Sequence, residues 1–200
     1  MMDRDAPIIG GRGTMFNNAE AYELNMGRWS RRLAPLFVEF AEVKDGERIL
    51  DVGGRTGSLS LALAGATTNA EIVGIDRSGA FVEYARRRGA DARLRFEIAT
   101  ALELPFRDSC FDKSLALLVM QLIPDALSAA RERYRVTRPG GVAAARTWDS
   151  REGRISFAFF GTQQRRSTCL PNLCGKPTDP TVTRKIFKPS GRPPGLKTLR

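Results

Sequence analysis

Three glycines follow directly after an apolar segment in the first third of the chain. Residues 48–52 and 58–66 are mostly apolar, and the bend between them contains Gly53, Gly54 and Gly57. Glycine has no Cβ, so it adopts positive φ easily and lets ligand atoms approach the main chain. A strand, a tight loop and a helix start in this order are typical of a nucleotide-binding site in an α/β fold.

A carboxylate ends the next apolar segment, residues 70–76. Asp76 lies at about the distance after the glycines at which a ribose-binding acid is expected. Together the two features predict a site for an adenosine-bearing cofactor. The plainer alternatives are an ordinary tight turn at the glycines and a carboxylate at Asp76 that caps the following helix.

Strand-like and helix-like segments alternate over about a hundred residues, which predicts βαβ units and a parallel sheet with helices on both faces. A helix is expected between residues 19 and 43, with Ser30 as its N-cap. Another is expected at 125–137, with Leu127, Ala130 and Tyr134 on its apolar face and Pro139-Gly140-Gly141 as its stop. The other expected elements are strands at 48–52, 71–75, 93–98, 111–118 and 142–148, helices at 57–66 and 79–88, and one further strand at 155–160.

The composition excludes several kinds of chemistry. The 200 residues contain no histidine, so Ser-His-Asp and Cys-His catalysis and histidine-ligated zinc are absent. Three cysteines without histidine partners make a poor metal site, and no metal is expected. No apolar run is long enough to span a membrane and the start does not resemble a secretory signal, so a cytoplasmic protein is expected.

The net positive charge lies almost entirely in the last quarter of the chain. Residues 1–150 carry 21 Lys and Arg against 20 Asp and Glu, whereas residues 151–200 carry 11 against 2. We therefore predict a mobile leader at 1–18, a cofactor-binding domain at 19–150, and a basic, proline-rich, poorly ordered tail at 151–200. Residues 1–150 contain 19 arginines and 2 lysines, whereas residues 151–200 contain 7 arginines and 4 lysines. This change in composition is consistent with a frameshifted C-terminus.

Five motifs in order give the domain a family resemblance. They are residues 49–57, 73–78, 99–106, 111–125 and 135–141. Over residues 19–149 the chain resembles the class I S-adenosylmethionine-dependent methyltransferases, in the small-molecule branch that includes the ubiquinone and menaquinone C-methyltransferases. The resemblance implies a Rossmann-like, doubly wound, mostly parallel sheet of order 3-2-1-4-5, with the usual last two strands missing or degraded. It also implies S-adenosylmethionine as cofactor and a small-molecule methyl acceptor as partner.

The resemblance also assigns roles to individual residues. Gly53 and Gly57 would shape the loop around the methionine and ribose parts of the cofactor, and Gly54 would absorb part of the bend. Asp51 would orient that loop or meet the methionine ammonium through water. In the ribose motif, Asp76 would accept from the ribose hydroxyls beside Arg77. The remaining contacts would be Thr100 and Ala101 at the adenine, Leu117 at the methionine moiety, and Tyr22 and Trp29 closing over the site, although helix packing is the plainer alternative for both aromatics. No catalytic residue is named, because an in-line methyl transfer can depend largely on positioning and desolvation.

Three residues depart from the family pattern. Arg55 stands where the family has the middle glycine, so a positive φ there would strain the backbone. Its side chain could point outward or reach the cofactor carboxylate. Thr100 replaces an aspartate that faces the adenine amino group, and Gln121 replaces a histidine of many relatives.

Three other functions remain as alternatives. Arg55, Thr100 and the unusual tail favour a catalytically impaired protein with a binding or scaffold role. A nicotinamide-dependent oxidoreductase is disfavoured, because the loop reads Gly53-x-x-x-Gly57 and no Tyr-x-x-x-Lys pair follows. RNA methylation is disfavoured because residues 117–122 lack the signature of amino-group nucleic-acid methylases, and a nucleic-acid partner is not expected. The enzymatic interpretation requires that Asp76 lie next to the glycine loop and that the Arg55 guanidinium stay out of the pocket.

Overall fold

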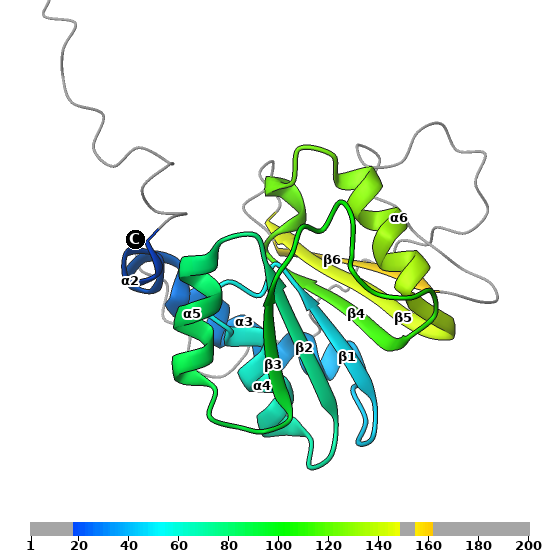
Figure 1. Ribbon diagram of the computed structural model, residues 1–200, viewed down its shortest axis with the longest axis horizontal. Coiled ribbons are helices and arrows are strands. Elements are labelled where there is room, and N and C mark those ends of the chain that lie inside the picture. Colours follow the sequence, from blue (N-terminus) through cyan, green and yellow to red (C-terminus); the bar gives the residue numbers. More distant parts are fainter. Residues whose placement is uncertain (1–17, 149–154, 162–200) are drawn as a thin grey trace, which may run out of the picture.

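A single sheet organises the chain. The computed structural model describes residues 18–148 and 155–161 (Figure 1). The strand order is β3-β2-β1-β4-β5-β6, with β1 to β5 parallel and β6 antiparallel to β5. The strands are β1 (Arg48–Val52), β2 (Glu71–Asp76), β3 (Leu94–Ile98), β4 (Phe111–Leu117), β5 (Thr137–Trp148) and β6 (Ile155–Gly161). The predicted order 3-2-1-4-5 is confirmed.

The sixth strand, β6, confirms the further strand expected at 155–160. It lies inside the range assigned to the tail and pairs with β5 from Trp148↔Ile155 to Val142↔Gly161, so β5 is not an open edge. The remainder of the predicted tail and residues 1–17 of the predicted leader lie outside the described residues.

Helices cover both faces of the sheet. They are α2 (Ala19–Tyr22), η1 (Glu23–Gly27), α3 (Arg28–Phe40), α4 (Ser58–Ala66), α5 (Gly79–Arg88), η2 (Met120–Leu122) and α6 (Ala126–Val136). Helices α3, α4 and α5 lie on one face and α6 on the other (Figure 1). Successive strand residues point to opposite faces, so Ile49 packs with α3 and α4, whereas Leu50 packs with α6. None of the helices in the described residues is long and apolar enough to cross a membrane.

The N-terminal helix begins earlier than its predicted cap. Segments α2, η1 and α3 follow one another without a break, and the Asn18 side chain accepts from the N–H groups of Glu20 and Ala21, both at 3.0 Å. The prediction that Ser30 caps a helix is therefore wrong, because Ser30 lies inside α3 and is buried. The middle segment is a π-helix, a form that often occurs at functional sites.

Helix α6 also differs from its prediction. It ends at Val136, and β5 starts at the next residue, so the Pro-Gly-Gly segment 139–141 lies within the strand instead of stopping the helix. Leu127 and Tyr134 are exposed, and the buried face instead carries Arg133, whose guanidinium donates to the hydroxyl and carbonyl oxygens of Ser114 and to the carbonyl oxygen of Ala144. These acceptors satisfy Nε and Nη2 of the buried guanidinium, whereas Nη1 has no hydrogen-bond partner among the described residues.

Candidate functional site

The loop between β1 and α4 turns through several left-handed residues. Gly53, Arg55 and Gly57 have φ angles of 70°, 50° and 82°. A Cβ added to Gly53 would lie 2.4 Å from Cγ2 of Val119, so both the conformation and the close packing require glycine there. The strained conformation anticipated for Arg55 is confirmed, because this L-residue occupies the left-handed region.

The glycine loop and the end of β2 are in direct contact. One carboxylate oxygen of Asp76 accepts the backbone N–H of Arg55 at 3.1 Å, and the other accepts the N–H of Ser78 at 2.9 Å. Burial raises the pKa of Asp76 above its ordinary value, although these N–H groups and the Arg55 charge oppose the rise. The predicted adjacency of loop and carboxylate is therefore confirmed.

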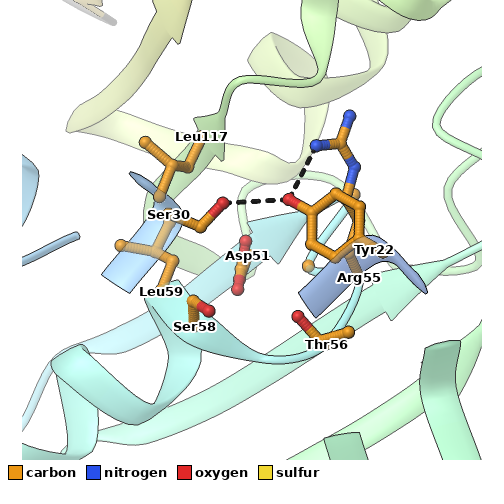
Figure 2. Close-up of a pocket in the computed structure, with 10 residues that line it drawn as sticks. Tyr22, Ser30, Asp51, Arg55, Thr56, Ser58, Leu59 and Leu117 are labelled. Atoms are coloured by element: carbon orange, nitrogen blue, oxygen red, sulfur yellow. Dashed lines mark hydrogen bonds between the residues drawn. The ribbon is translucent and has the colours of Figure 1, made fainter. Parts of the chain in front are cut away.

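A small pocket lies beside this contact (Figure 2). We call it the loop pocket and define it by the residues that line it, which are Tyr22, Ser30, Asp51, Gly53, Gly54, Arg55, Thr56, Ser58, Leu59 and Leu117. The space left inside for water-sized molecules is about 10 Å³, which is room for about one water.

The Arg55 side chain lines the loop pocket and is buried there. Its guanidinium donates to the Tyr22 hydroxyl at 2.9 Å and to the Leu118 carbonyl at 3.0 Å, and it lies 5.0 Å from the centre of the Tyr22 ring. Tyr22 in turn shares a 2.9 Å hydrogen bond with Ser30 (Figure 2). Only 6% of Arg55 is exposed. The side chain therefore points neither outward nor toward an open cofactor site.

Three polar atoms of the loop pocket have no hydrogen-bond partner among the described residues. They are Oδ1 of Asp51, Oγ1 of Thr56 and Oγ of Ser58, and all three are buried. The other carboxylate oxygen of Asp51 accepts from the N–H and hydroxyl of Ser60, at 3.1 and 2.7 Å. Burial raises the pKa of Asp51 to about 6. Buried polar atoms are normally paired, so these three suit a polar ligand or water.

A second group of residues lies where β3 ends, and we call it the open end. It consists of Ile98, Thr100, Ala101 and Leu102. Ile98 is 63% exposed and Leu102 is 41% exposed, and the Thr100 hydroxyl accepts the Leu102 N–H at 3.2 Å. None of these residues lines the loop pocket.

The structure sorts the predicted site residues into separate places. Tyr22, Asp51, Gly53, Gly54, Arg55 and Leu117 line the loop pocket. Gly57 packs against Ala85 and Phe96 instead. Asp76 touches the loop, whereas Arg77, Thr100 and Ala101 lie outside the pocket and Arg77 is exposed. Trp29 does not line the pocket, and the roles of all these residues toward a cofactor stay predictions.

Sequence reasoning missed several parts of the site. Thr56, Ser58 and Leu59 line the pocket and lie inside or directly after the predicted loop, so their positions were available from the motif. Ser30 and the Leu118 carbonyl reach the site from distant elements, and no local pattern marks them.

An adenosyl cofactor fits only part of this arrangement. The Asp76 carboxylate stands where ribose hydroxyls would meet it, and the open end leaves exposed apolar and polar groups for a base. The loop pocket does not fit the methionine part while Arg55 occupies it, so the requirement that the guanidinium stay out of the pocket is not met. No cluster of potential metal ligands occurs within the described residues.

Comparisons with known proteins agree with this geometry. A family model described as a methyltransferase domain (Methyltransf_11) matches residues 50–145. An uncharacterized protein of Mycobacterium tuberculosis is 34% identical over 131 residues, which are 64% of this chain and 45% of that protein. The demethylmenaquinone methyltransferase of Thermus thermophilus is 40% identical over 117 residues, which are 57% of this chain and 51% of the relative. The chain thus spans about half the length of these curated relatives.

One similar solved structure shares the fold but is named for a different reaction. The cyclase SpnF is 33% identical, with a TM-score of 0.55, over 58% of this chain and 44% of that one. Because a cyclase is among the similar structures, the fold alone does not fix the reaction. The match to the family model, the relatives and the sheet order together assign residues 50–145 to the class I S-adenosylmethionine-dependent methyltransferases.

Proposed function

We propose that this domain binds S-adenosylmethionine at the carboxyl ends of β1 and β2, with the Arg55 side chain displaced from the loop pocket, and transfers the methyl group to a small molecule. The observation that carries the proposal is the 3.1 Å hydrogen bond from the Arg55 N–H to Asp76. It joins the glycine loop to the acid at the carboxyl ends of adjacent parallel strands, where α/β sheets bind ligands.

Each polar group of the site has a proposed task. The Asp76 carboxylate has lone pairs left for ribose hydroxyls, because its oxygens accept only one hydrogen bond each from the loops. The unpaired oxygen of Asp51 suits a cationic ammonium group, and the Tyr22 ring suits a cation over its face. When bound, the cofactor supplies an electrophilic methyl group.

The rest of the domain would contribute positioning and exclusion of water. The loop pocket is lined mostly by buried residues, and α3 covers it through Ser30. Positioning and desolvation can provide much of the rate of an in-line displacement. We assign no general base.

The acceptor belongs to the proposal as well. The Thermus relative is named for demethylmenaquinone, and this supports an acceptor that is not a macromolecule. The relatives extend well beyond the matched region, so residues absent from this alignment would contribute to acceptor choice in them.

A second candidate is a binding protein without methyl transfer. The observation that favours it is the Arg55 guanidinium inside the loop pocket, held by Tyr22 and Leu118. The two candidates share the adenosyl site and differ in whether a methyl group is transferred.

Calorimetry and a turnover assay test the proposal. Titration with S-adenosylhomocysteine should give binding that Asp76→Asn weakens at least about tenfold, as expected for a lost charge-assisted hydrogen bond. The exposed Glu83→Ala on α5 is the control and should leave affinity unchanged. Release of S-adenosylhomocysteine from S-adenosylmethionine with a reduced demethylated naphthoquinone would support methyl transfer. Binding without turnover across a panel of small acceptors favours the second candidate, and equal binding by both variants contradicts the proposed site.

A further inference from the structure

We infer that Arg55 determines which adenosyl ligands this domain accepts. Its guanidinium takes the place of the aminoacyl arm, so the domain binds adenosine derivatives that lack this arm in preference to S-adenosylmethionine. The inference rests on the proposed adenosyl site and goes beyond it, because it concerns ligand choice and holds with or without methyl transfer.

The first support is the location of the guanidinium. The loop pocket is lined by the residues assigned to the methionine part, which are Tyr22, Asp51, Gly53 and Leu117, and by none of those assigned to adenine. With Arg55 in place, the space left is about 10 Å³, far less than an amino acid arm needs. A ligand with this arm must therefore displace Arg55, whereas a ligand without it need not.

The second support is charge. Arg55 makes the contacts that a cationic ligand would make, with the face of the Tyr22 ring at 5.0 Å and with the Leu118 carbonyl at 3.0 Å. A sulfonium or ammonium brought into the same pocket would repel the guanidinium, and like charges repel strongly in a buried site. Volume and charge thus act in the same direction.

The third support is that Arg55 can leave without stranding its partners. The Leu118 carbonyl also accepts from Gln121 Nε2 at 2.8 Å, and the Tyr22 hydroxyl keeps its bond to Ser30. With Arg55 inside, in contrast, the polar atoms of Asp51, Thr56 and Ser58 stay unpaired. The barrier to the methionine arm is therefore finite, and it should appear as a measurable loss of affinity.

The backbone contact with Asp76 does not depend on the side chain. Asp76 accepts the N–H of Arg55, and any residue except proline provides this group. Glycine also suits the φ of 50°. Arg55→Gly should therefore empty the loop pocket and keep the adenosine contacts.

A cycle of ligands and variants tests the inference by calorimetry. The ligands are S-adenosylmethionine, S-adenosylhomocysteine and 5′-methylthioadenosine, which lacks the aminoacyl arm. We expect the natural chain to bind methylthioadenosine more tightly than S-adenosylmethionine. Arg55→Gly should bind the two ligands with the arm at least about tenfold more tightly, and methylthioadenosine within about twofold of the natural chain.

One further variant separates the effect of the Arg55 charge from that of its volume, and a second controls for the general loss of a positive charge. Arg55→Met keeps a long side chain without the charge, so it should improve binding of S-adenosylmethionine more than of S-adenosylhomocysteine, because only the former carries the sulfonium. Arg131→Ala removes an exposed arginine of α6 and should change no affinity.

The outcomes distinguish failure of the inference on Arg55 from failure of the proposed function. If Arg55→Gly tightens all three ligands equally, or none of them, Arg55 does not compete with the arm and the inference is wrong. If neither the natural chain nor Arg55→Gly binds any ligand, the proposed adenosyl site itself is wrong and the inference is lost with it. If the cycle behaves as expected and no methyl transfer is found, the inference stands and only the catalytic part of the proposed function fails.

Discussion

The loop pocket and the open end differ in how much room they leave for a ligand. In the loop pocket a buried arginine, a buried tyrosine and a buried aspartate lie within one small space, and the glycine loop packs closely on Val119. At the open end Ile98 and Leu102 are exposed. One half of the proposed ligand site is thus filled by the chain itself, while the other half faces solvent.

This difference separates the requirements of folding from those of binding. The strand order, the loop bend and the Asp76 contact are present although Arg55 stands where the family resemblance implies a glycine, because the left-handed conformation at this position costs only about 1–3 kcal/mol. The space for a ligand is more sensitive to this substitution, because one long side chain is enough to occupy it. A substitution can therefore leave the fold intact and still prevent a ligand from binding.

Substitution of Asp51 should have the largest effect among tests of how well the loop pocket excludes water. Its pKa is about 6 in the folded protein, above the ordinary 3.8, so the folded state binds more protons between these values and stability falls as pH rises through them. Asp51→Asn removes this effect. Relative to the natural chain, the variant should gain up to about 3 kcal/mol of unfolding free energy between pH 4 and pH 7, measured by urea denaturation.

A capping aspartate supplies the control for this measurement. Hydrogen bonds from Ser128 lower the pKa of Asp125, so its contribution to stability is present above its unfolded pKa and is lost as pH falls. Relative to the natural chain, Asp125→Asn should lose stability as pH rises, opposite in sign to Asp51→Asn. A difference between Asp51→Asn and the natural chain that does not change with pH would show that water reaches Asp51 freely.

The contact between Tyr22 and Arg55 gives a smaller test. Tyr22→Phe removes the hydroxyl that accepts from Arg55 and bonds Ser30, and it should lower stability by about 1 kcal/mol in the natural chain. In an Arg55→Gly background the loss should be smaller, because only the bond to Ser30 remains. The difference between the two losses, measured by denaturant unfolding, is the coupling energy of the pair. A coupling energy of zero would show that Arg55 does not rest on Tyr22 in solution.

Much of the fold was predictable because the strands have a strong local pattern. The apolar run of β1 ends at Gly53 and that of β2 ends at Asp76, and βαβ connections leave few possible sheet orders. The start of the N-terminal helix was not predictable from Ser30, because Asn18 caps the helix twelve residues earlier. The buried face of α6 was missed because Arg133 finds its acceptors on β4 and β5, far away in sequence.

The site shows the same division between local and distant information. The strain at Arg55 and the closeness of Asp76 followed from the motif and its spacing. The direction of the Arg55 side chain did not, since its partners Tyr22 and Leu118 lie 33 and 63 residues away. A motif fixes the path of the loop backbone, but distant packing decides whether the pocket is filled.

The open end offers the smallest and most local test. Thr100 stands where the family has an aspartate that faces the adenine amino group, and its hydroxyl already accepts the Leu102 N–H. Thr100→Asp should tighten binding of methylthioadenosine about threefold, a modest gain because the position is exposed to water. The corresponding hypoxanthine nucleoside, which has an oxygen instead of the amino group, should not gain, and calorimetry on both ligands makes the comparison. An equal gain for both ligands would mean that the new carboxylate does not accept from the amino group, because an oxygen at that position cannot donate to it.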